Sequence, residues 1–135
     1  MKQAFWAVTA GLALSACVAT VEPGSVEKGR IAFAQDCAGC HGADAKGGGP
    51  LAAGLAVAPP DLTTLSARNG GTFPQVYVMA IIDGLDRGEH FSDAMPEFGA
   101  GDLGDPIVVE LDEGLGTPVP ERLLALAAYL ETLQE

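Results

Sequence analysis

The sequence predicts one small, predominantly α-helical domain with little polypeptide core. Ser25 is suited to cap a helix over residues 26–36, and residues 118–135 carry an apolar stripe at helical spacing. With 18 Gly and 6% aromatic residues in 135, the core is thin for a domain of this size. A large apolar group at its centre would therefore supply much of the buried surface that the polypeptide lacks.

The N-terminus has the features of a secretory signal. Lys2 precedes an apolar run over residues 4–14, which is too short to cross a bilayer, where ~20 apolar residues are needed. The following Leu14-Ser15-Ala16-Cys17 resembles the bacterial lipobox, in which the Cys is lipidated and becomes the first mature residue. Ordinary cleavage after Ala16 would prefer a small residue at position 14. We therefore expect removal of residues 1–16, lipidation of Cys17, a tether over 17–24 and a domain over 25–135.

The most informative stretch is Cys37-Ala38-Gly39-Cys40-His41, because Cys-x-x-Cys-His is the spacing for attachment of a c-type haem. Two thiols three positions apart can form thioethers with the two vinyl groups of one porphyrin. The adjacent imidazole then serves as the proximal iron ligand. The sequence therefore predicts one covalent haem c, held by Cys37 and Cys40, with His41 on the iron.

Three other interpretations of this motif compete with haem. A zinc site needs two further ligands, and the chain offers only Cys17 and His90. A thiol-disulfide motif is expected to open a helix after a strand, whereas this one follows a helix and precedes a Gly-rich loop. An inert pair of structural cysteines is the third alternative.

The first and last predicted helices have surfaces that suit each other. Gly29, Phe33 and Cys37 recur every four residues and share one face of the first helix. A mid-helix Gly costs roughly 0.5–1 kcal/mol relative to Ala, so Gly29 indicates a close approach by another segment. The C-terminal helix, expected to begin near Pro118 or Pro120, is the predicted partner. Its apolar stripe, flanked by Tyr129, comprises Leu123, Leu126, Ala127, Leu130 and Leu133.

A haem motif between two helices that cross at a glycine beside an aromatic residue resembles monohaem class I cytochrome c. The resemblance covers nearly all of residues 25–135. It implies the cytochrome c fold, which is mainly all-α, with three to five helices wrapped around one covalently bound haem. It also implies single-electron transfer without a small-molecule substrate, so we expect no catalytic residue and no enzyme activity.

Residues 42–60 are rich in Gly and Pro and predict a long loop. The resemblance implies that this loop wraps the proximal side. There, the carbonyl of a proline corresponding to Pro50 would accept the imidazole N–H of His41 and fix the ring. A proline that serves only the turn is the alternative.

Residues 76–82 are apolar on most faces and predict a buried helix that Gly84 ends. Thr72 and Gln75 have the spacing of a capping box at its start. Met79 lies within this helix among equally apolar neighbours. We therefore expect Met79 to pack in the core.

The distal iron ligand is assigned to Met95, in a turn-rich segment. A thioether is a soft, weak ligand that suits an electron-transfer haem. Pro96 restricts the backbone at Met95, and the resemblance implies a distal methionine with a following proline. His90, five residues away, is the rival ligand, and Met79 is a further alternative.

Residues 101–120 depart from the simplest form of the family. They contain a short strand-like insertion near 105–112, followed by a Gly/Pro-rich stretch. The insertion is expected to be either a flap over the haem edge or a docking surface for a neighbouring subunit.

The charge of the chain bears on its partners. Seven basic and 18 acidic residues give a net charge of -11, and loss of residues 1–16 removes only Lys2. So acidic a protein is excluded as a nucleic-acid binder, and it favours redox partners with basic docking surfaces. The alternative is that the charge serves solubility alone.

Together these features predict a lipid-anchored electron-transfer protein of the bacterial cell envelope. It would face the periplasm, on either the inner or the outer membrane, and shuttle single electrons between respiratory or dehydrogenase partners. Two alternatives stay open. The chain could be the haem c subunit of a larger oxidoreductase, or, with a labile distal ligand, a gas-binding or peroxidatic haem protein.

Overall fold

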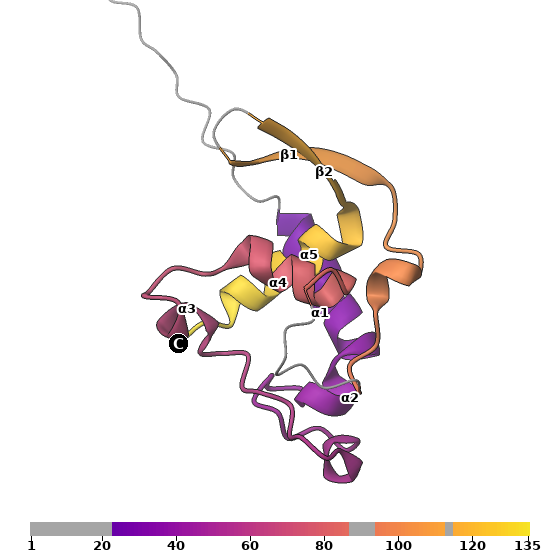
Figure 1. Cartoon of the computed structure of the whole chain (residues 1–135), viewed down its shortest axis with the longest axis vertical. Coiled ribbons are helices and arrows are strands. Elements are labelled where there is room, and N and C mark those ends of the chain that lie inside the picture. Colours follow the sequence, from indigo (N-terminus) through magenta and orange to yellow (C-terminus); the bar gives the residue numbers. More distant parts are fainter. Residues whose placement is uncertain (1–22, 87–93, 113–114) are drawn as a thin grey trace, which may run out of the picture.

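The computed structural model describes residues 23–86, 94–112 and 115–135 (Figure 1). The signal segment 1–16, Cys17, most of the tether and His90 lie outside these residues. The expected mainly helical fold is confirmed. The elements are α1 (Pro23–Asp36), α2 (Ala38–His41), η1 (Ala52–Gly54), α3 (Leu65–Arg68), α4 (Gln75–Asp83), η2 (Phe98–Ala100), β1 (Pro106–Asp112), β2 (Leu115–Pro120) and α5 (Glu121–Thr132).

The helices α1 and α5 cross at Gly29, as the sequence predicts. A Cβ atom at Gly29 would lie 1.9 Å from the carbonyl oxygen of Ala125 and 2.8 Å from Cβ of Tyr129, so no larger residue fits. One turn further on, the Phe33 and Tyr129 rings pack with centroids 5.5 Å apart. Ser25 lies inside α1 rather than capping it, because the helix begins at Pro23.

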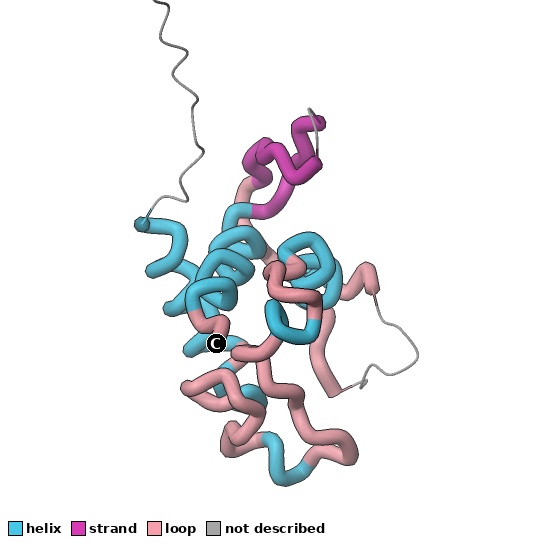
Figure 2. The backbone as a smooth tube through the Cα atoms, turned by 90° about the vertical axis from the view of Figure 1, so that its left-hand side faces the viewer, coloured by secondary structure: helices cyan, strands magenta, loops and turns pink. Residues whose placement is uncertain are grey.

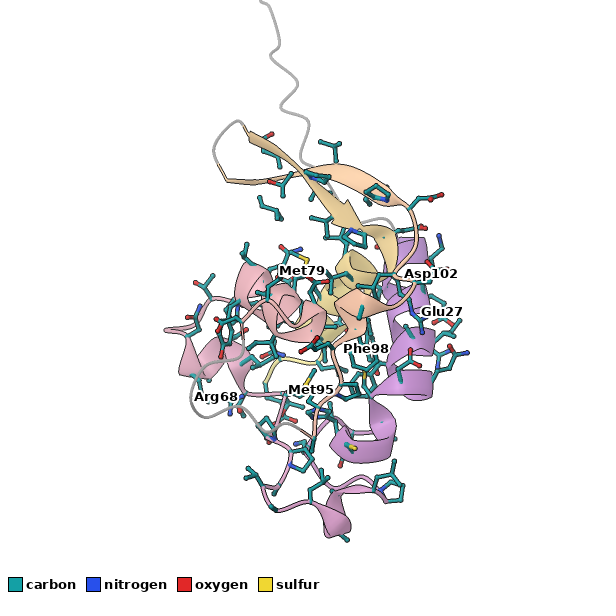
Figure 3. All side chains as sticks on the ribbon, turned by 45° about the vertical axis from the view of Figure 1, so that its right-hand side comes forward. Glu27, Arg68, Met79, Met95, Phe98 and Asp102 are labelled. Carbon is teal, nitrogen blue, oxygen red and sulfur yellow. The ribbon has the colours of Figure 1, made fainter. Side chains whose placement is uncertain are left out.

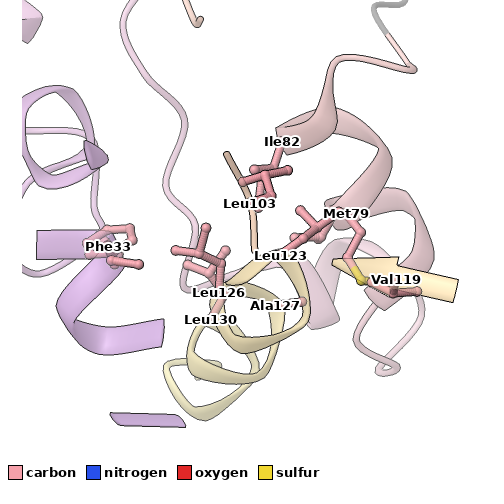
Figure 4. Close-up of a cluster of buried hydrophobic side chains, with 12 residues drawn as sticks. Phe33, Met79, Ile82, Leu103, Val119, Leu123, Leu126, Ala127 and Leu130 are labelled. Atoms are coloured by element: carbon pink, nitrogen blue, oxygen red, sulfur yellow. The ribbon is translucent and has the colours of Figure 1, made fainter. Parts of the chain in front are cut away.

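The core forms around α5, whose apolar stripe faces both α1 and α4 (Figure 4). Leu123, Leu126 and Leu130 are at most 5% exposed, and Phe33 of α1 is 2% exposed. Met79 of α4 is buried in the same cluster, where packing was expected. The cluster comprises Ala32, Phe33, Ala45, Val78, Met79, Ile82, Leu103, Val119, Leu123, Leu126, Ala127 and Leu130.

The ends of α4 agree only in part with the sequence analysis. Gly84 ends the helix with a left-handed backbone, φ 96°, as predicted. At the start, however, Pro74 is the N-cap and no side chain caps the helix, so the capping box expected between Thr72 and Gln75 does not form. Thr72 lies two residues too early to cap a helix that begins at Gln75.

Loops fill the part of the molecule opposite the β-hairpin (Figure 2). Residues 42–60 are irregular apart from η1, and α3 is a short helix that the sequence analysis did not predict. The C-terminus fastens these loops to α5. The Gln134 side chain accepts from Ser66 N at 2.9 Å and donates to Leu62 O at 2.9 Å, while Glu135 N donates to Thr63 O at 3.0 Å.

The strand-like insertion is one half of an antiparallel hairpin. Its first strand, β1, agrees with the predicted run near 105–112, but β2 occupies a Gly/Pro-rich stretch that we expected to be loop. Ile107 pairs with Val119 and Val109 with Thr117. Val119 is buried against the core, so the base of the hairpin is joined to α5.

Within the described residues, no helix combines the length and apolar character required to cross a bilayer.

Candidate functional site

The Cys-x-x-Cys-His motif is held by main-chain hydrogen bonds at the junction of α1 and α2. Cys37 N donates to Phe33 O at 2.9 Å, so the first cysteine continues the α1 ladder. Cys40 and His41 lie in the short helix α2, where both of their N–H groups donate to Cys37 O. The three side chains named by the motif are therefore gathered within about one helical turn.

Cys37 and Cys40 form no disulfide with each other, and Cys37 is not suited to thiol exchange. Burial of the Cys37 side chain, helped by the negative charge of Asp36, raises the pKa of its thiol to about 12. A thiol-disulfide catalyst needs a thiolate near neutral pH, and hence a lowered pKa. The structure thus gives no support to the thiol-disulfide interpretation.

The zinc interpretation is not supported either. In the part of the chain that the structure describes, no three His, Cys, Asp or Glu side chains are gathered so that they could hold a metal ion. Any iron at this motif would have to bring most of its own ligands, as the iron of a porphyrin does.

His41 is half-buried and suited to bind a metal through one ring nitrogen. Burial lowers the pKa of His41, which favours the neutral imidazole, the form that ligates metals. The carbonyl of Pro60 approaches the ring and partly offsets this shift. Nevertheless, Nδ1 is buried without a hydrogen bond of ordinary length and angle within the described residues. An Nδ1–H that faces Pro60 would leave the Nε2 lone pair for a haem iron, so the residues fit the group.

The expectation for Pro50 needs correction on this point. The carbonyl that approaches His41 is that of Pro60, whereas Pro50 is exposed and lies between residues bound to α2. Gly49 N donates to Cys40 O and Leu51 N to Gly39 O, so Pro50 serves the turn that fastens this loop to the motif. The loop then returns toward α2 at residues 59–60, which brings the carbonyl of Pro60 to the imidazole ring of His41.

This loop packs tightly on the motif. Gly47 N donates to His41 O at 2.7 Å, and Gly49 N to Cys40 O at 3.1 Å. A Cβ atom at Gly49 would lie 2.4 Å from Gly39 O and 2.7 Å from Ala38 O. Only glycine therefore allows the loop to approach the α2 backbone at this point.

Met95 lies in the middle of the molecule, below Phe98 and between the helices and the loops of residues 42–64 (Figure 3). Its side chain is half-buried and packs against the same core cluster as Cys37. The structure therefore brings the predicted distal ligand to the core that the haem motif also borders. Met79, the other methionine considered, is buried within that core cluster. His90 lies outside the described residues.

The segment after Met95 rests on the C-terminal end of α4. A Cβ atom at Gly99 would lie 2.4 Å from Asp83 O, and one at Gly84 would lie 2.8 Å from Cγ of Glu97. These two glycines thus allow residues 97–99 to rest on the helix end. The sequence analysis did not predict this contact or the roles of Gly49 and Pro60. The residues next to a Gly or Pro in the sequence do not indicate which distant segment it contacts in the fold.

In a comparison with protein families, the family model described as Cytochrome c matches residues 26–113, about two thirds of the chain. The match contains the Cys-x-x-Cys-His motif, Met95 and β1. Among curated proteins, none matches the chain.

Proposed function

Because the chain belongs to the cytochrome c family, whose members bind covalent haem c and transfer electrons, we propose that it is a membrane-tethered carrier of single electrons. The observation that carries the proposal is the location of the half-buried Met95, which packs against the core that Cys37 also borders. Cys37 and Cys40 would hold one haem by thioethers, while His41 and Met95 would ligate its iron. The bound haem supplies a metal that gains and loses one electron.

Three features of the described residues support this proposed site. The α2 backbone fixes His41 relative to both thiols, and the Pro60 carbonyl faces the ring. The contacts at Gly84 and Gly99 hold the segment that follows Met95. If His41 and Met95 both ligate the iron, no coordination position would be left for a substrate, which is why we propose a carrier rather than an enzyme.

A redox titration of the haem-loaded, detergent-extracted protein tests this function. We expect one reversible transition that involves one electron, and a reduced form that does not bind carbon monoxide readily. Rapid binding of carbon monoxide by the reduced protein would contradict the proposal. It would favour a gas-binding or peroxidatic haem protein, in which the distal position is open.

A tether to the cell envelope completes the proposal. The support is the sequence alone: an apolar signal followed by Leu14-Ser15-Ala16-Cys17. Each buried acyl CH₂ contributes about 0.8 kcal/mol, so two or three chains on Cys17 would anchor the protein to the inner or outer membrane, facing the periplasm. We expect Cys17→Ser to release the protein into the soluble fraction with its haem still attached. Membrane association that survives this substitution would contradict the lipid anchor.

The proposed partners are redox proteins with basic docking surfaces, as the net charge of -11 favours. Association with them should weaken as salt screens the charges. A free carrier elutes alone after detergent extraction. Stable co-elution with a dehydrogenase or oxidase would identify it as a subunit instead.

A further inference from the structure

The β-hairpin has two edges that differ in their ability to pair with another strand. In an antiparallel ladder, hydrogen-bonded pairs alternate with pairs that exchange no hydrogen bond. Val108 is opposite Pro118, which has no N–H, so these two cannot form a mutual pair. The main-chain N–H and C=O of Val108 therefore point away from β2.

The same alternation applies to the rest of the hairpin. On β2, the outward positions include Pro118 and Pro120, and neither can donate a hydrogen bond to an added strand. On β1, Val108 is 74% exposed, and its main chain has no partner in a third segment of the described chain. Two outward positions of β2 are thus prolines, whereas on β1 only the outward Pro106 is one, and Val108 keeps a donor and an acceptor.

A surface groove of about 440 Å³ lies between residues 110–111 of β1 and the start of α4. Val76 and Tyr77, each 53% exposed, supply apolar and aromatic surface on its helical side. Glu110 supplies a carboxylate on the strand side. The groove is lined by Phe73, Pro74, Gln75, Val76, Tyr77, Glu110 and Leu111.

Charge indicates what this groove can receive. Residues 88–121 contain nine Asp and Glu residues and no Lys or Arg. The described Lys and Arg side chains already have oxygen partners: Lys28 binds Glu121, Arg30 binds Glu27, Lys46 binds Glu135, Arg122 binds Asp36 and Arg68 binds the Asp61 carbonyl. A second copy of this acidic chain would be repelled, whereas a basic segment would be attracted.

We propose that an extended basic segment of a protein partner adds a third strand to the open edge of β1. Its main chain would pair with Val108, and alternate side chains would contact Val76 and Tyr77 or solvent. A Lys or Arg of the segment would lie beside Glu110. The inference rests on the proposed function only for the redox nature of the partner, because the docking itself involves none of the haem-binding residues.

Binding of a probe peptide to the haem-loaded protein tests this proposal. The probe is a peptide of about eight residues that alternates Lys and Val, and the control peptide alternates Glu and Val. We expect the basic peptide to bind, with slower amide hydrogen exchange at Val108, and the acidic peptide not to bind. Equal binding of both peptides, or no slowing at Val108, would overturn the proposal.

A matched pair of variants separates main-chain pairing from side-chain contact. Val108→Pro removes the outward N–H at an exposed edge position, while Val108→Thr keeps it. We expect Val108→Pro to weaken binding about tenfold or more and Val108→Thr to change it less than about twofold. Equal losses in both variants would rule out strand pairing. The exchange measurement on the wild type decides the question if Val108→Pro does not fold.

Two further measurements test the charge of the partner and the self-association of the chain. Glu110→Gln should weaken binding of the basic peptide about threefold and reduce its salt dependence. The oligomeric state is measured alongside: a wild-type dimer that Val108→Pro dissociates would assign the edge to a second copy and overturn the basic partner. The redox titration tests electron transfer separately from peptide binding. A failure of the docking therefore leaves the electron-transfer proposal intact, and a failure of the redox titration leaves the docking proposal intact.

Discussion

The two sides of the candidate haem site are built by different means. On the proximal side, Cys40 and His41 lie in one short helix, and a loop close in sequence is hydrogen-bonded to its backbone. On the distal side, the segment that carries Met95 is held by contacts of Glu97 and Gly99 with the end of α4. The position of the proposed proximal ligand, His41, thus depends on local main-chain structure, and that of the proposed distal ligand, Met95, on tertiary packing. We therefore expect distal changes to alter ligation without loss of the attached haem.

The largest effect is expected from Gly49→Ala on the proximal side. The added Cβ would lie 2.4 Å from Gly39 O, and main chain cannot move aside as a flexible side chain can. We expect a loss of about 3 kcal/mol of stability and a low yield of haem-loaded protein. Thermal unfolding and covalent haem content measure these effects.

Gly48→Ala is the matched control, because no atom lies within 4 Å of a Cβ at Gly48. We expect this variant to behave like the wild type. If both variants load haem normally, the proximal loop does not require the close approach at Gly49.

A smaller and more selective effect is expected from Gly99→Ala. Its Cβ would lie 2.4 Å from Asp83 O, so the segment that follows Met95 must shift. We expect covalent haem at wild-type yield, a stability loss of about 1–2 kcal/mol and a weaker far-red absorption band of ferric haem bound by methionine sulfur. Gly54→Ala, which meets no atom within 4 Å, is the control. Loss of haem attachment in Gly99→Ala would contradict the difference between the two sides.

The smallest effect concerns Asp61 in the loop that leads to α3. The hydroxyl and N–H of Thr63 donate to its carboxylate and hold the pKa of Asp61 below its usual value. Its stabilising contribution is therefore complete above the ordinary pKa, near 4, and is lost as pH falls through the lowered value. Melting temperatures of wild type and Asp61→Asn should differ at neutral pH and converge in acid. A difference in melting temperature that grows toward acid pH would contradict the stabilising role of the Asp61 carboxylate.

The haem motif and the two main helices could be predicted from the sequence because the patterns that indicate them are local. The spacing of Cys37, Cys40 and His41 follows from the chemistry of one porphyrin, and periodicity identified α1 and α5. Gly29 indicated their crossing, since an interior helical glycine needs a close neighbour to explain it. These predictions required no knowledge of distant contacts beyond helix packing.

The remainder depends on tertiary contacts that the sequence does not reveal. The strand β2 contains Gly116, Pro118 and Pro120, which disfavour strands, and it forms only because β1 pairs with it. Pro60 takes the position beside His41 that was expected of Pro50, because the loop returns to the ring after η1. The glycines at 49 and 99 owe their roles to carbonyl oxygens of other segments.

The central claim is that Met95 ligates the iron, and the spectrum of the oxidised, haem-loaded protein tests it most directly. We expect a weak far-red band in the wild type that persists in Met79→Leu, a volume-conserving change in the core, and disappears in Met95→Ala. The same band in Met95→Ala, or no band in the wild type together with rapid binding of carbon monoxide to its reduced form, would contradict the account.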